Sequence, residues 1–449
     1  MKRKNLIAWI MTVALAMTAL VGCGNKANEE SSDPPAASSE EEPKETDGET
    51  EATQITYMTN ADFVETLKPI VAKYKEETGV EVVLEGYSMG DLFDVIEVKI
   101  SGETTDYDVI AVDAPLVSAY VHRGYLEPMT DYFTEEEKAK LTETSVNGGS
   151  VDGVFYSPAM NTSSVCMYYN TALLKQAGIE IGEVNPENRM SWDEVLEMAR
   201  KTLDVVNPDK TNGIYGVEFR QVSRVYQMNM IPNSMGGQNI GEDGFTVDGV
   251  LNSKEWIDGM TWYQNLVNEG ISSRGIAADE LRTMFAAGKI VFMVDTTSLT
   301  NYCETNGMED FDVMPVPAYT GYEDQVATGT GSWHFGINYA SANKQAAADF
   351  IKWMSIGEGA DLWYEGYNQV PTKIAILEEM EKDANLDKSM KIAAYEANNT
   401  AFLRAVTPGF NEYQTILNAA WEDVRNGEDV ETTLNSAVEQ IEAAMEAYK

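Results

Sequence analysis

Two carboxylates follow short apolar runs and have the chemistry to bind a polar ligand. Asp62 comes after an apolar run at residues 55–58, and Asp113 comes after another at 107–112. A carboxylate accepts hydrogen bonds from ligand hydroxyl groups. In a sheet of parallel strands, ligands bind beyond the carboxyl ends of the strands. The spacing therefore predicts a ligand cleft here, although an aspartate at a strand end can also cap a helix or stabilise a turn.

Residues suited to metal binding are scarce. The 449 residues include two histidines, His122 and His334, and three cysteines. Neither a CxxC pair nor an HExxH sequence occurs, so we expect no metal site and no cofactor. Cys166 and Cys303 are 137 positions apart. They either form a disulfide, which an oxidising compartment permits, or remain two buried thiols.

The third cysteine, Cys23, ends a sequence typical of an exported protein. Cationic residues at positions 2–4 precede an apolar run of 16 residues at 6–21. That run is shorter than the about 20 residues that a membrane span needs, and the whole pattern is typical of a signal peptide. The last four residues, LVGC, resemble a bacterial lipobox. We expect residues 1–22 to be removed and Cys23 to carry lipid, with an ordinary signal peptide or an uncleaved anchor as the alternative.

The residues after Cys23 have the composition of a flexible linker. Residues 24–54 contain ten Asp and Glu residues, two lysines and many Ser, Pro and Gly residues. Such a segment cannot bury enough apolar surface to fold, so 23–54 is predicted to be a disordered stalk. The chain as a whole has a net charge of −41. This acidity argues against nucleic-acid binding, which needs clustered Lys and Arg.

Short apolar runs and amphipathic helical patterns alternate from residue 55 onward. Strands are expected at 55–58, 80–84, 107–112, 289–294, 312–317 and 335–338, and helices at 63–78, 91–100, 115–123, 191–206, 253–269, 281–287, 344–354 and 430–448. Ser191 and Ser253 are the expected caps of their helices, and Glu194 stands at the capping-box position. The alternation predicts an α/β fold with a parallel, doubly wound sheet. After the run at 6–21, the sequence has no other long apolar stretch that would span a membrane.

A set of motifs follows in a characteristic order over residues 55–449. They include "YDVIAVDAPLVSAYVHRGYLEPM" at 107–129, "GVFYSPAMNTSSVCMYYNTALLKQAGI" at 153–179, "MFAAGKIVFMV" at 284–294 and "GINYASANKQAAADFIKWMSIGEGADLWYEGYNQVPTK" at 336–373. Each motif is weak alone. The ordered set resembles the family 1 extracellular solute-binding proteins of ABC importers, the group that contains the maltose-binding protein.

This resemblance implies a two-lobed periplasmic-binding-protein-like fold of type II, with ligand bound between lobes that move about a hinge. One lobe would comprise 55–162 plus 317–354, and the other 163–316 plus 355–449. The chain would cross between the lobes near 161–163, 315–318 and 355–357.

The resemblance also implies a carbohydrate ligand, which is held by polar groups and by aromatic rings that cover its C–H faces. The expected ligand contacts are Asp62, Tyr87, Asp113, Asn161, Thr162, Arg224, Tyr226, Trp333, Tyr364, Tyr367, Arg404 and Tyr413. Several positions depart from the maltose-binding protein. A Glu of that protein is Arg224 here, and its stacking Trp is Ser298. Trp333 and Tyr413 are the expected replacements for that ring.

The expected protein is therefore a monomer and not an enzyme. It would be lipid-anchored on the extracellular face of the cell membrane and would deliver a sugar to ABC permease subunits. One alternative keeps the fold but binds a polyamine, peptide, phosphate ester or metal chelate. Another is a secreted glycoside hydrolase, which needs two carboxylates about 5–10 Å apart and for which no motif is present. A structural adhesin would show repeats, and the sequence has none.

Overall fold

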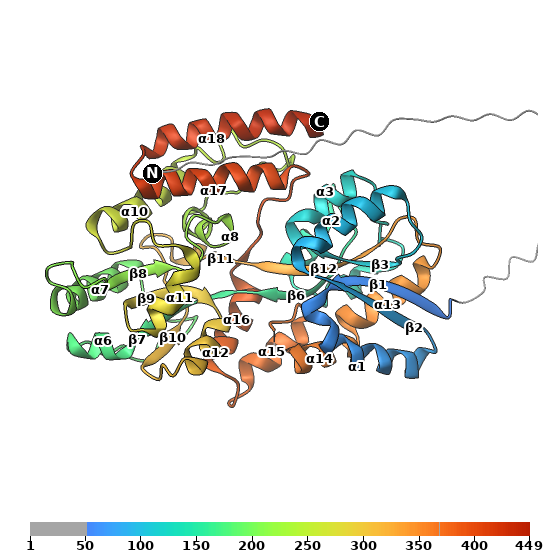
Figure 1. Cartoon of the computed structure of the whole chain (residues 1–449), viewed down its shortest axis with the longest axis horizontal. Coiled ribbons are helices and arrows are strands. Elements are labelled where there is room, and N and C mark those ends of the chain that lie inside the picture. The colour runs from blue at the N-terminus through green and yellow to red at the C-terminus, as the bar shows by residue number, and fades with distance from the viewer. Residues whose placement is uncertain (1–51, 368) are drawn as a thin grey trace, which may run out of the picture. The chain divides into compact units, whose positions relative to one another are not determined.

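A computed structural model describes residues 52–367 and 369–449 (Figure 1). These residues lie in one unit at 51–449. The signal peptide, the lipid on Cys23 and the stalk were expected at residues 1–54, nearly all of which lie outside the described residues. Strand β1 begins at Gln54, one residue before the expected start of the folded region. Within the described ranges, no helix combines the length and apolar character that a bilayer crossing requires.

The first sheet has the strand order β2-β1-β3-β12-β6 (Figure 1). Its strands are β1 Gln54–Asn60, β2 Glu81–Tyr87, β3 Val109–Asp113, β6 Ala159–Ser163 and β12 Gly331–Ile337. β1, β2 and β3 are parallel, as predicted. β12 runs antiparallel to both β3 and β6, so the expectation of a wholly parallel sheet is wrong. The reason is that the chain enters β12 from β10 of the second sheet, with no α-helix between them to serve as the crossover that keeps successive strands parallel.

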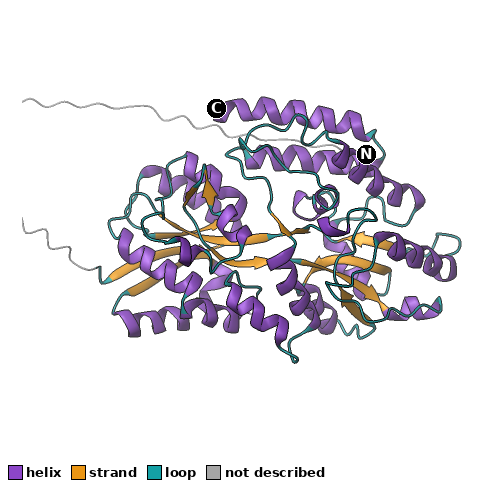
Figure 2. Ribbon diagram, turned by 180° about the vertical axis from the view of Figure 1, so that it is seen from behind, coloured by secondary structure: helices purple, strands orange, loops and turns teal. Residues whose placement is uncertain are grey.

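Helices cover both faces of this sheet (Figure 2). They are α1 Ala61–Thr78, α2 Met89–Lys99, α3 Val117–His122, α13 Lys344–Ile356 and α14 Glu358–Tyr367. α1 begins where the Asn60 side chain accepts a 2.9 Å hydrogen bond from the backbone N–H of Asp62. It buries Phe63, Leu67 and other apolar residues at helical spacing. It ends at Gly79, whose φ of +80° is one that glycine adopts easily.

The second sheet has the strand order β10-β7-β9-β8. Its strands are β7 Val165–Asn170, β8 Tyr215–Phe219, β9 Ile290–Thr296 and β10 Phe311–Met314. β7 is antiparallel to β9 and β10, while β8 is parallel to β9. The helices associated with it are α6 Thr171–Gln176, α7 Trp192–Val206, α10 Lys254–Glu269, α11 Ala278–Ala286, α12 Ser298–Thr305, α16 Lys388–Asn399, α17 Phe410–Asn426 and α18 Val430–Met445.

The two serine caps expected from the sequence have different outcomes. The Ser191 hydroxyl accepts from the N–H of Glu194, and the Glu194 carboxylate accepts from the N–H of Ser191, which confirms the capping box of α7. Ser253 does precede α10, but its hydroxyl makes no cap hydrogen bond and has no hydrogen-bond partner among the described residues. The position of that helix start was predicted correctly, and its side-chain cap was not.

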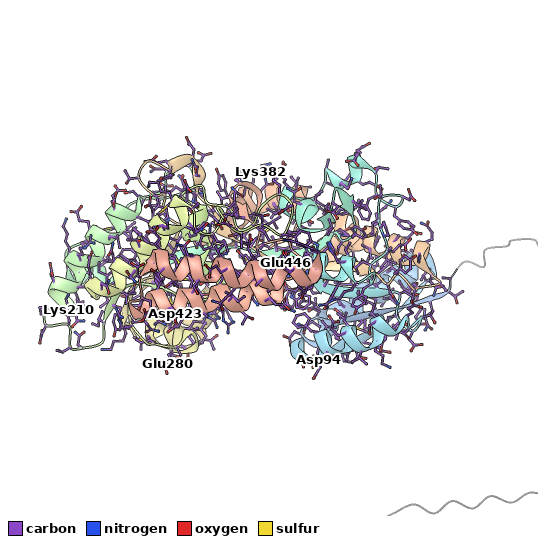
Figure 3. All side chains as sticks on the ribbon, turned by 90° about the horizontal axis from the view of Figure 1, so that it is seen from above. Asp94, Lys210, Glu280, Lys382, Asp423 and Glu446 are labelled. Carbon is purple, nitrogen blue, oxygen red and sulfur yellow. The ribbon has the colours of Figure 1, made fainter. Side chains whose placement is uncertain are left out.

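Short elements complete the described chain. They are α4 Glu135–Lys138, α5 Glu143–Gly148, β4 Ser150–Val151, β5 Val154–Phe155, α8 Val225–Met228, α9 Met230–Asn233, β11 Thr328–Gly329, α15 Ile374–Lys382 and β13 Ala401–Phe402, with 3-10 turns at Ile100–Gly102, Ala114–Leu116, Glu323–Gln325 and Glu446–Tyr448. Many acidic side chains project from the surface, among them Asp94, Glu280 and Asp423 (Figure 3). Cys166 and Cys303 are buried free thiols rather than a disulfide.

Within residues 52–367 and 369–449, the chain passes between the two sheets three times. Only Ser164 separates β6 from β7, and residues 315–330 connect β10 to β12. The third passage differs from the expectation at 355–357. α14 packs on α1, with the rings of Phe63 and Trp363 5.3 Å apart between centroids. The chain therefore stays with the first sheet beyond residue 355, because the apolar face of α14 is buried there.

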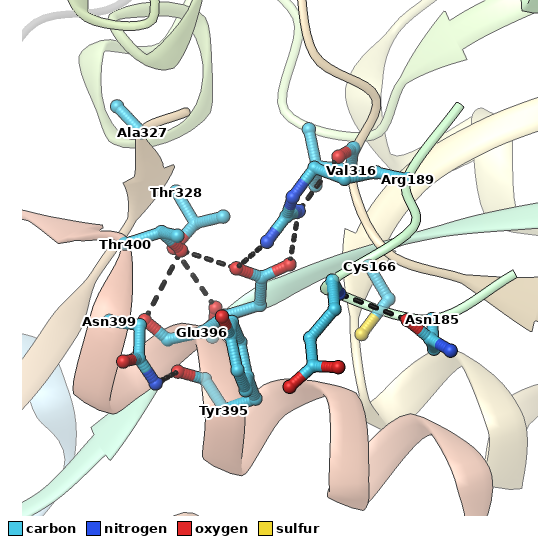
Figure 4. Close-up of polar contacts among 12 residues, drawn as sticks. Cys166, Asn185, Arg189, Val316, Ala327, Thr328, Tyr395, Glu396, Asn399 and Thr400 are labelled. Atoms are coloured by element: carbon cyan, nitrogen blue, oxygen red, sulfur yellow. Dashed lines mark hydrogen bonds and ion pairs between the residues drawn. The ribbon is translucent and has the colours of Figure 1, made fainter. Parts of the chain in front are cut away.

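A buried ion pair holds the later passages together (Figure 4). Arg189 donates to both carboxylate oxygens of Glu396 on α16, at 2.7 and 3.0 Å, and to the backbone carbonyl of Val316 at 3.0 Å. The Thr400 hydroxyl donates to the same carboxylate. The Glu396 side chain is fully buried and the Arg189 side chain is 10 % exposed. This pair links the loop before α7, the 315–330 connection and α16.

Candidate functional site

A cavity of about 550 Å³ lies between segments associated with the two sheets. One wall comes from α3, α5 and the turn between β4 and β5, and the opposite wall comes from the loop 238–245. The segment 397–408 also lines the cavity as the chain passes from α16 through β13 to α17 (Figure 1). A space of this size is typical of a site for a small ligand.

The cavity lining is polar and includes aromatic rings. Its amide side chains are Asn147, Gln238, Asn239, Asn398 and Asn399, its carboxylates are Glu143, Asp152, Glu242 and Asp243, and its rings are His122, Phe245 and Phe402. The His122 and Phe245 rings meet edge to face from opposite walls, 6.2 Å apart. Amides donate and accept hydrogen bonds, and ring faces cover C–H surfaces. This lining suits a ligand with many hydroxyl groups.

Asn239 fixes the geometry of two walls. Its side-chain nitrogen donates to the backbone carbonyl of Leu403 at 2.7 Å, and its backbone carbonyl accepts from the Tyr413 hydroxyl at 2.8 Å. Its side-chain oxygen accepts from Asn229 and Asn233. Because these groups are paired and most of them are buried, the loop 238–245 and the segment 397–408 are held in one arrangement.

Arg404 connects the cavity to the carboxyl ends of the first sheet. Its Nη2 donates to Asp113 Oδ1 at 2.9 Å, and the two side chains are 13 % and 19 % exposed. The same guanidinium lies 5.8 Å from the ring centroid of Tyr226 and 5.7 Å from that of Phe410. A single side chain therefore contacts Asp113 beside the first sheet and two rings beside the second.

Tyr226 contributes its ring and its hydroxyl to the same region. The hydroxyl lies 2.7 Å from the Ser163 hydroxyl. Burial raises the pKa of Tyr226 above its ordinary value, and the hydrogen bond with Ser163 opposes this increase only in part. The side chain is therefore a neutral phenol at physiological pH, able to donate and accept hydrogen bonds.

Trp333 and Asn161 face each other on adjacent strands near Asp113. In the register of the sheet, Trp333 of β12 lies opposite Asp113 of β3 and opposite Asn161 of β6. The half-buried indole meets Phe63 edge to face and stacks on Phe93, with centroid separations of 5.7 and 6.2 Å. The Asn161 side chain donates to Gln369 and accepts from the N–H of Trp333. The predicted residues Asp113, Asn161, Trp333 and Arg404 therefore lie close to one another.

Two predicted contacts are buried in a way that excludes ligand. Tyr413 is 0 % exposed, and its hydroxyl is occupied by the Asn239 carbonyl. A ring with no exposed face cannot cover a sugar, so the expectation that Tyr413 replaces the missing Trp is wrong. Thr162 is 3 % exposed, and its hydroxyl pairs with that of Thr330 at 2.5 Å. Thr162 therefore connects β6 to the segment before β12 rather than facing the cavity.

The remaining predicted residues lie away from the cavity lining. Asp62 and Arg224 are exposed, and the Tyr87 hydroxyl pairs with Glu85 and Tyr107 at 3.0 and 3.1 Å. Tyr367 stacks on Trp363 with 4.7 Å between centroids. Tyr364 lines a separate groove of about 650 Å³ between α14 and α15.

Most of the cavity lining was missed from the sequence. Arg404 is the one predicted residue among the described lining residues. The others come from four short segments far apart in the chain. Ser118 and His122 lie in the motif quoted at 107–129, but neither was predicted as a ligand contact. Among the described residues, no group of three or more His, Cys, Asp and Glu side chains is arranged to hold a metal ion.

With this geometry in hand, comparison with known families matches residues 60–355 to the bacterial extracellular solute-binding proteins. The chain belongs to this family. The match covers more than half of the chain and confirms the family resemblance inferred from the ordered motifs. Members of this family bind solutes outside the cell.

Individual relatives extend the similarity. The chain is 22 % identical over 435 residues to the maltooligosaccharide ABC transporter solute-binding lipoprotein of Streptococcus pneumoniae, covering 96 % of this chain and 95 % of the relative. It is 23 % identical over 312 residues to the sn-glycerol-3-phosphate-binding periplasmic protein of Agrobacterium fabrum, covering 66 % of this chain and 68 % of that relative.

Solved structures confirm the fold. A cyclo/maltodextrin-binding protein complexed with maltotetraose superposes with a TM-score of 0.75 at 17 % identity, covering 89 % of this chain and 98 % of the other. An extracellular solute-binding protein from Staphylococcus aureus in complex with maltose gives 0.74 at 15 % identity, covering 88 % and 99 %. At these identities the likeness establishes the fold alone, which is the expected two-lobed α/β fold of a solute-binding protein.

Proposed function

We propose that this protein captures a carbohydrate, of oligosaccharide length, in the cavity between its lobes and delivers it to an ABC permease. The observation that carries the proposal is the lining of the cavity, in which amides, carboxylates and rings from both walls surround about 550 Å³. Polar groups fix the hydroxyls of a sugar, and rings cover its C–H faces. The maltooligosaccharide-binding relative, similar over nearly the whole chain, supports the same ligand class.

A phosphate ester is the alternative that the glycerol-3-phosphate-binding relative suggests. Recognition of a phosphate favours several converging cations or free backbone N–H groups. Among the described residues lining the cavity, Arg404 is the one Lys or Arg, and it already pairs with Asp113. This observation favours an uncharged sugar over glycerol phosphate. We propose no catalytic activity, in keeping with a family of binding proteins.

The proposal also includes the cellular location of the protein. Lipid on Cys23 would anchor the protein at the extracellular face of the membrane, and the acidic stalk would let the two lobes reach the permease as a monomer. The lobe limits inferred from the sequence are kept in this proposal, except that α14 is moved to the first lobe because it packs on α1.

Calorimetric titration of the full chain in mild detergent tests the ligand class. The panel contains maltotriose, maltotetraose, cellotriose, sn-glycerol 3-phosphate, spermidine and a dipeptide mixture. We expect one group of sugars to bind with a Kd of about 1 μM or below, with no product released after prolonged incubation. If no sugar gives a heat of binding and glycerol phosphate or spermidine does, the proposed ligand class is wrong. Release of a shorter sugar would instead favour the hydrolase alternative.

A further inference from the structure

Four exposed carboxylates stand at the rim of the cavity. Glu143 on α5 and Asp152 in the turn after β4 belong to one wall, and Glu242 and Asp243 belong to the loop on the other. We call these four the rim carboxylates. Within the described chain, Asp152 and Glu242 have no side-chain hydrogen bond or ion pair, and Glu143 only accepts a 3.4 Å contact from Asn147. The carboxylates of Asp152 and Glu242 therefore keep their negative charges beside the cavity without a protein partner among the described residues.

Asp243 is firmly ionised. Its carboxylate accepts from the backbone N–H groups of Phe245 and Thr246 and from the Thr246 hydroxyl, at 2.6 to 2.9 Å. The Thr246 hydroxyl and these N–H groups lower the pKa of Asp243 to about 2. The hydrogen bonds fix the carboxylate in place and leave its charge uncancelled.

The nearby cations do not balance this charge. Arg404, which lines the cavity, donates to Asp113 at 2.9 Å. Lys449 lies near Asp243, but its Nζ pairs with Glu446 at 2.8 Å. An opening bordered by charges of one sign concentrates ligands of the opposite sign and repels those of the same sign.

We infer that the cavity selects among carbohydrates by charge, in the order amine-bearing, then uncharged, then phosphate- or carboxylate-bearing. This inference rests on the proposed function, because it assumes a carbohydrate in this cavity. A protonated amine on the sugar would lie near the rim carboxylates and gain Coulomb attraction, whereas an anionic sugar would meet four like charges and would have to displace Asp113 from Arg404. The cavity supplies the site, and the rim carboxylates set its charge preference.

A matched ligand series tests the order. Maltotriitol, its counterpart with a primary amine in place of the terminal hydroxyl, and maltotrionate share two intact rings and differ in the charge of an open end. A second series on another backbone compares cellotriose, the glucosamine trimer and its N-acetylated form. Titration of the full chain should show the amine binding about fivefold tighter than the neutral ligand, and the carboxylate about fivefold weaker. High ionic strength should reduce both differences.

A charge-matched pair of variants assigns the effect to the rim. In the triple variant Glu143→Gln, Asp152→Asn, Glu242→Gln, the ratio of amine to neutral affinity should fall towards one. The control Asp94→Asn, Glu280→Gln, Asp423→Asn removes the same charge from the outer surface (Figure 3) and should keep the ratio.

The outcomes separate the two proposals. Equal affinities within each series, or the same loss of ratio in both triple variants, overturn the charge selection and leave carbohydrate binding standing. If no ligand of either series binds, carbohydrate binding itself is contradicted, and the charge selection with it.

Discussion

At the residue scale, Arg404 is the side chain on which the most contacts of the site converge. It pairs with Asp113 beside the first sheet and lies over Tyr226 and Phe410 beside the second. A ligand in the cavity therefore meets a guanidinium whose position is already set by both lobes. This arrangement lowers the entropy that the side chain must lose on binding.

Arg404→Ala should weaken binding of the sugar that the calorimetric panel identifies by roughly 1–2 kcal/mol, because the variant loses one partly buried ion pair and its contacts with two rings. The measurement is the Kd of the full chain. Arg224→Ala is the control, since Arg224 is exposed and lies outside the cavity lining. Equal Kd values for the two variants would contradict the central position given to Arg404.

A second residue-scale prediction concerns Glu218, which lies on β8 and is 1 % exposed. Its Oε1 accepts from the N–H of Ser273, while Oε2 has no partner among the described residues. Burial raises the pKa of Glu218 from 4.5 to about 7, and the Ser273 and Arg425 interactions oppose this rise. The folded state thus holds a proton that the unfolded state releases above pH 4.5. The free energy of unfolding must then fall as the pH rises from about 4.5 through 7.

Glu218→Gln should remove this pH dependence. Relative to the variant, the native protein should lose up to about 3 kcal/mol of unfolding free energy between pH 4.5 and pH 8. Urea unfolding at a series of pH values measures it. Glu431→Gln, an exposed position on α18, should follow the native curve. Parallel curves for the native protein and Glu218→Gln would show that Glu218 titrates normally.

Sequence reasoning identified residues near the cavity, but of its lining it identified Arg404 and missed the rest. Asp113 was identified from its place after a strand, and Tyr226, Trp333 and Arg404 from the family resemblance. Tyr413 was misplaced because a tyrosine near the start of a helix has the same sequence signal whether its ring faces a cleft or the core. Amides and carboxylates such as Asn147 and Glu242 gave no signal, since polar loop residues are common and only the fold brings them together.

At the element scale, the contact between the loop before α7 and α16 is a buried ion pair between distant segments. Arg189 and Glu396 form it with two hydrogen bonds, and Val316 and Thr400 supply further partners (Figure 4). A buried charge that loses its partner keeps its desolvation penalty. The element contact should therefore be sensitive to either residue.

Arg189→Met should lower the free energy of unfolding by about 3–5 kcal/mol, because it leaves the Glu396 carboxylate buried without its partner. The matched control is Arg200→Met, which breaks an ion pair with Glu269 whose two side chains are each 48 % exposed, and which should cost less than about 1 kcal/mol. Denaturant midpoints give both values. The double variant Arg189→Met, Glu396→Gln should recover part of the loss, and a single variant as stable as the control would refute the role of the pair.

Elements were predictable where the apolar period and the cap agreed, as in α1 and α7. They were not predictable where tertiary packing decides the assignment. α14 was placed with the wrong lobe because its sequence shows a buried face but not the partner, Phe63 of α1, against which that face packs. The direction of β12 was missed for a similar reason. Whether a strand is parallel or antiparallel to its neighbours depends on the side of the sheet from which the chain enters it, and the sequence does not show this.

At the scale of the whole molecule, residues 52–449 should fold and bind independently of the segment before them. β1 starts at Gln54 and pairs with β2 along its whole length, so a boundary at residue 52 keeps every pair of that ladder. We expect the 52–449 fragment to match the full chain in sugar affinity and melting temperature. Circular dichroism and calorimetry check this. A fragment that unfolds or loses affinity would show that residues 1–51 contribute to the domain.

The three passages of the chain between the two sheets have a consequence for protease resistance. Two compact bodies joined by one linker fall apart after a single cut. Here a cut in residues 315–330 leaves β6 joined to β7 through Ser164, and leaves the later passage through α15 and α16 intact. A nicked molecule therefore keeps both walls of the cavity, and its two fragments should migrate as one particle until a denaturant separates them.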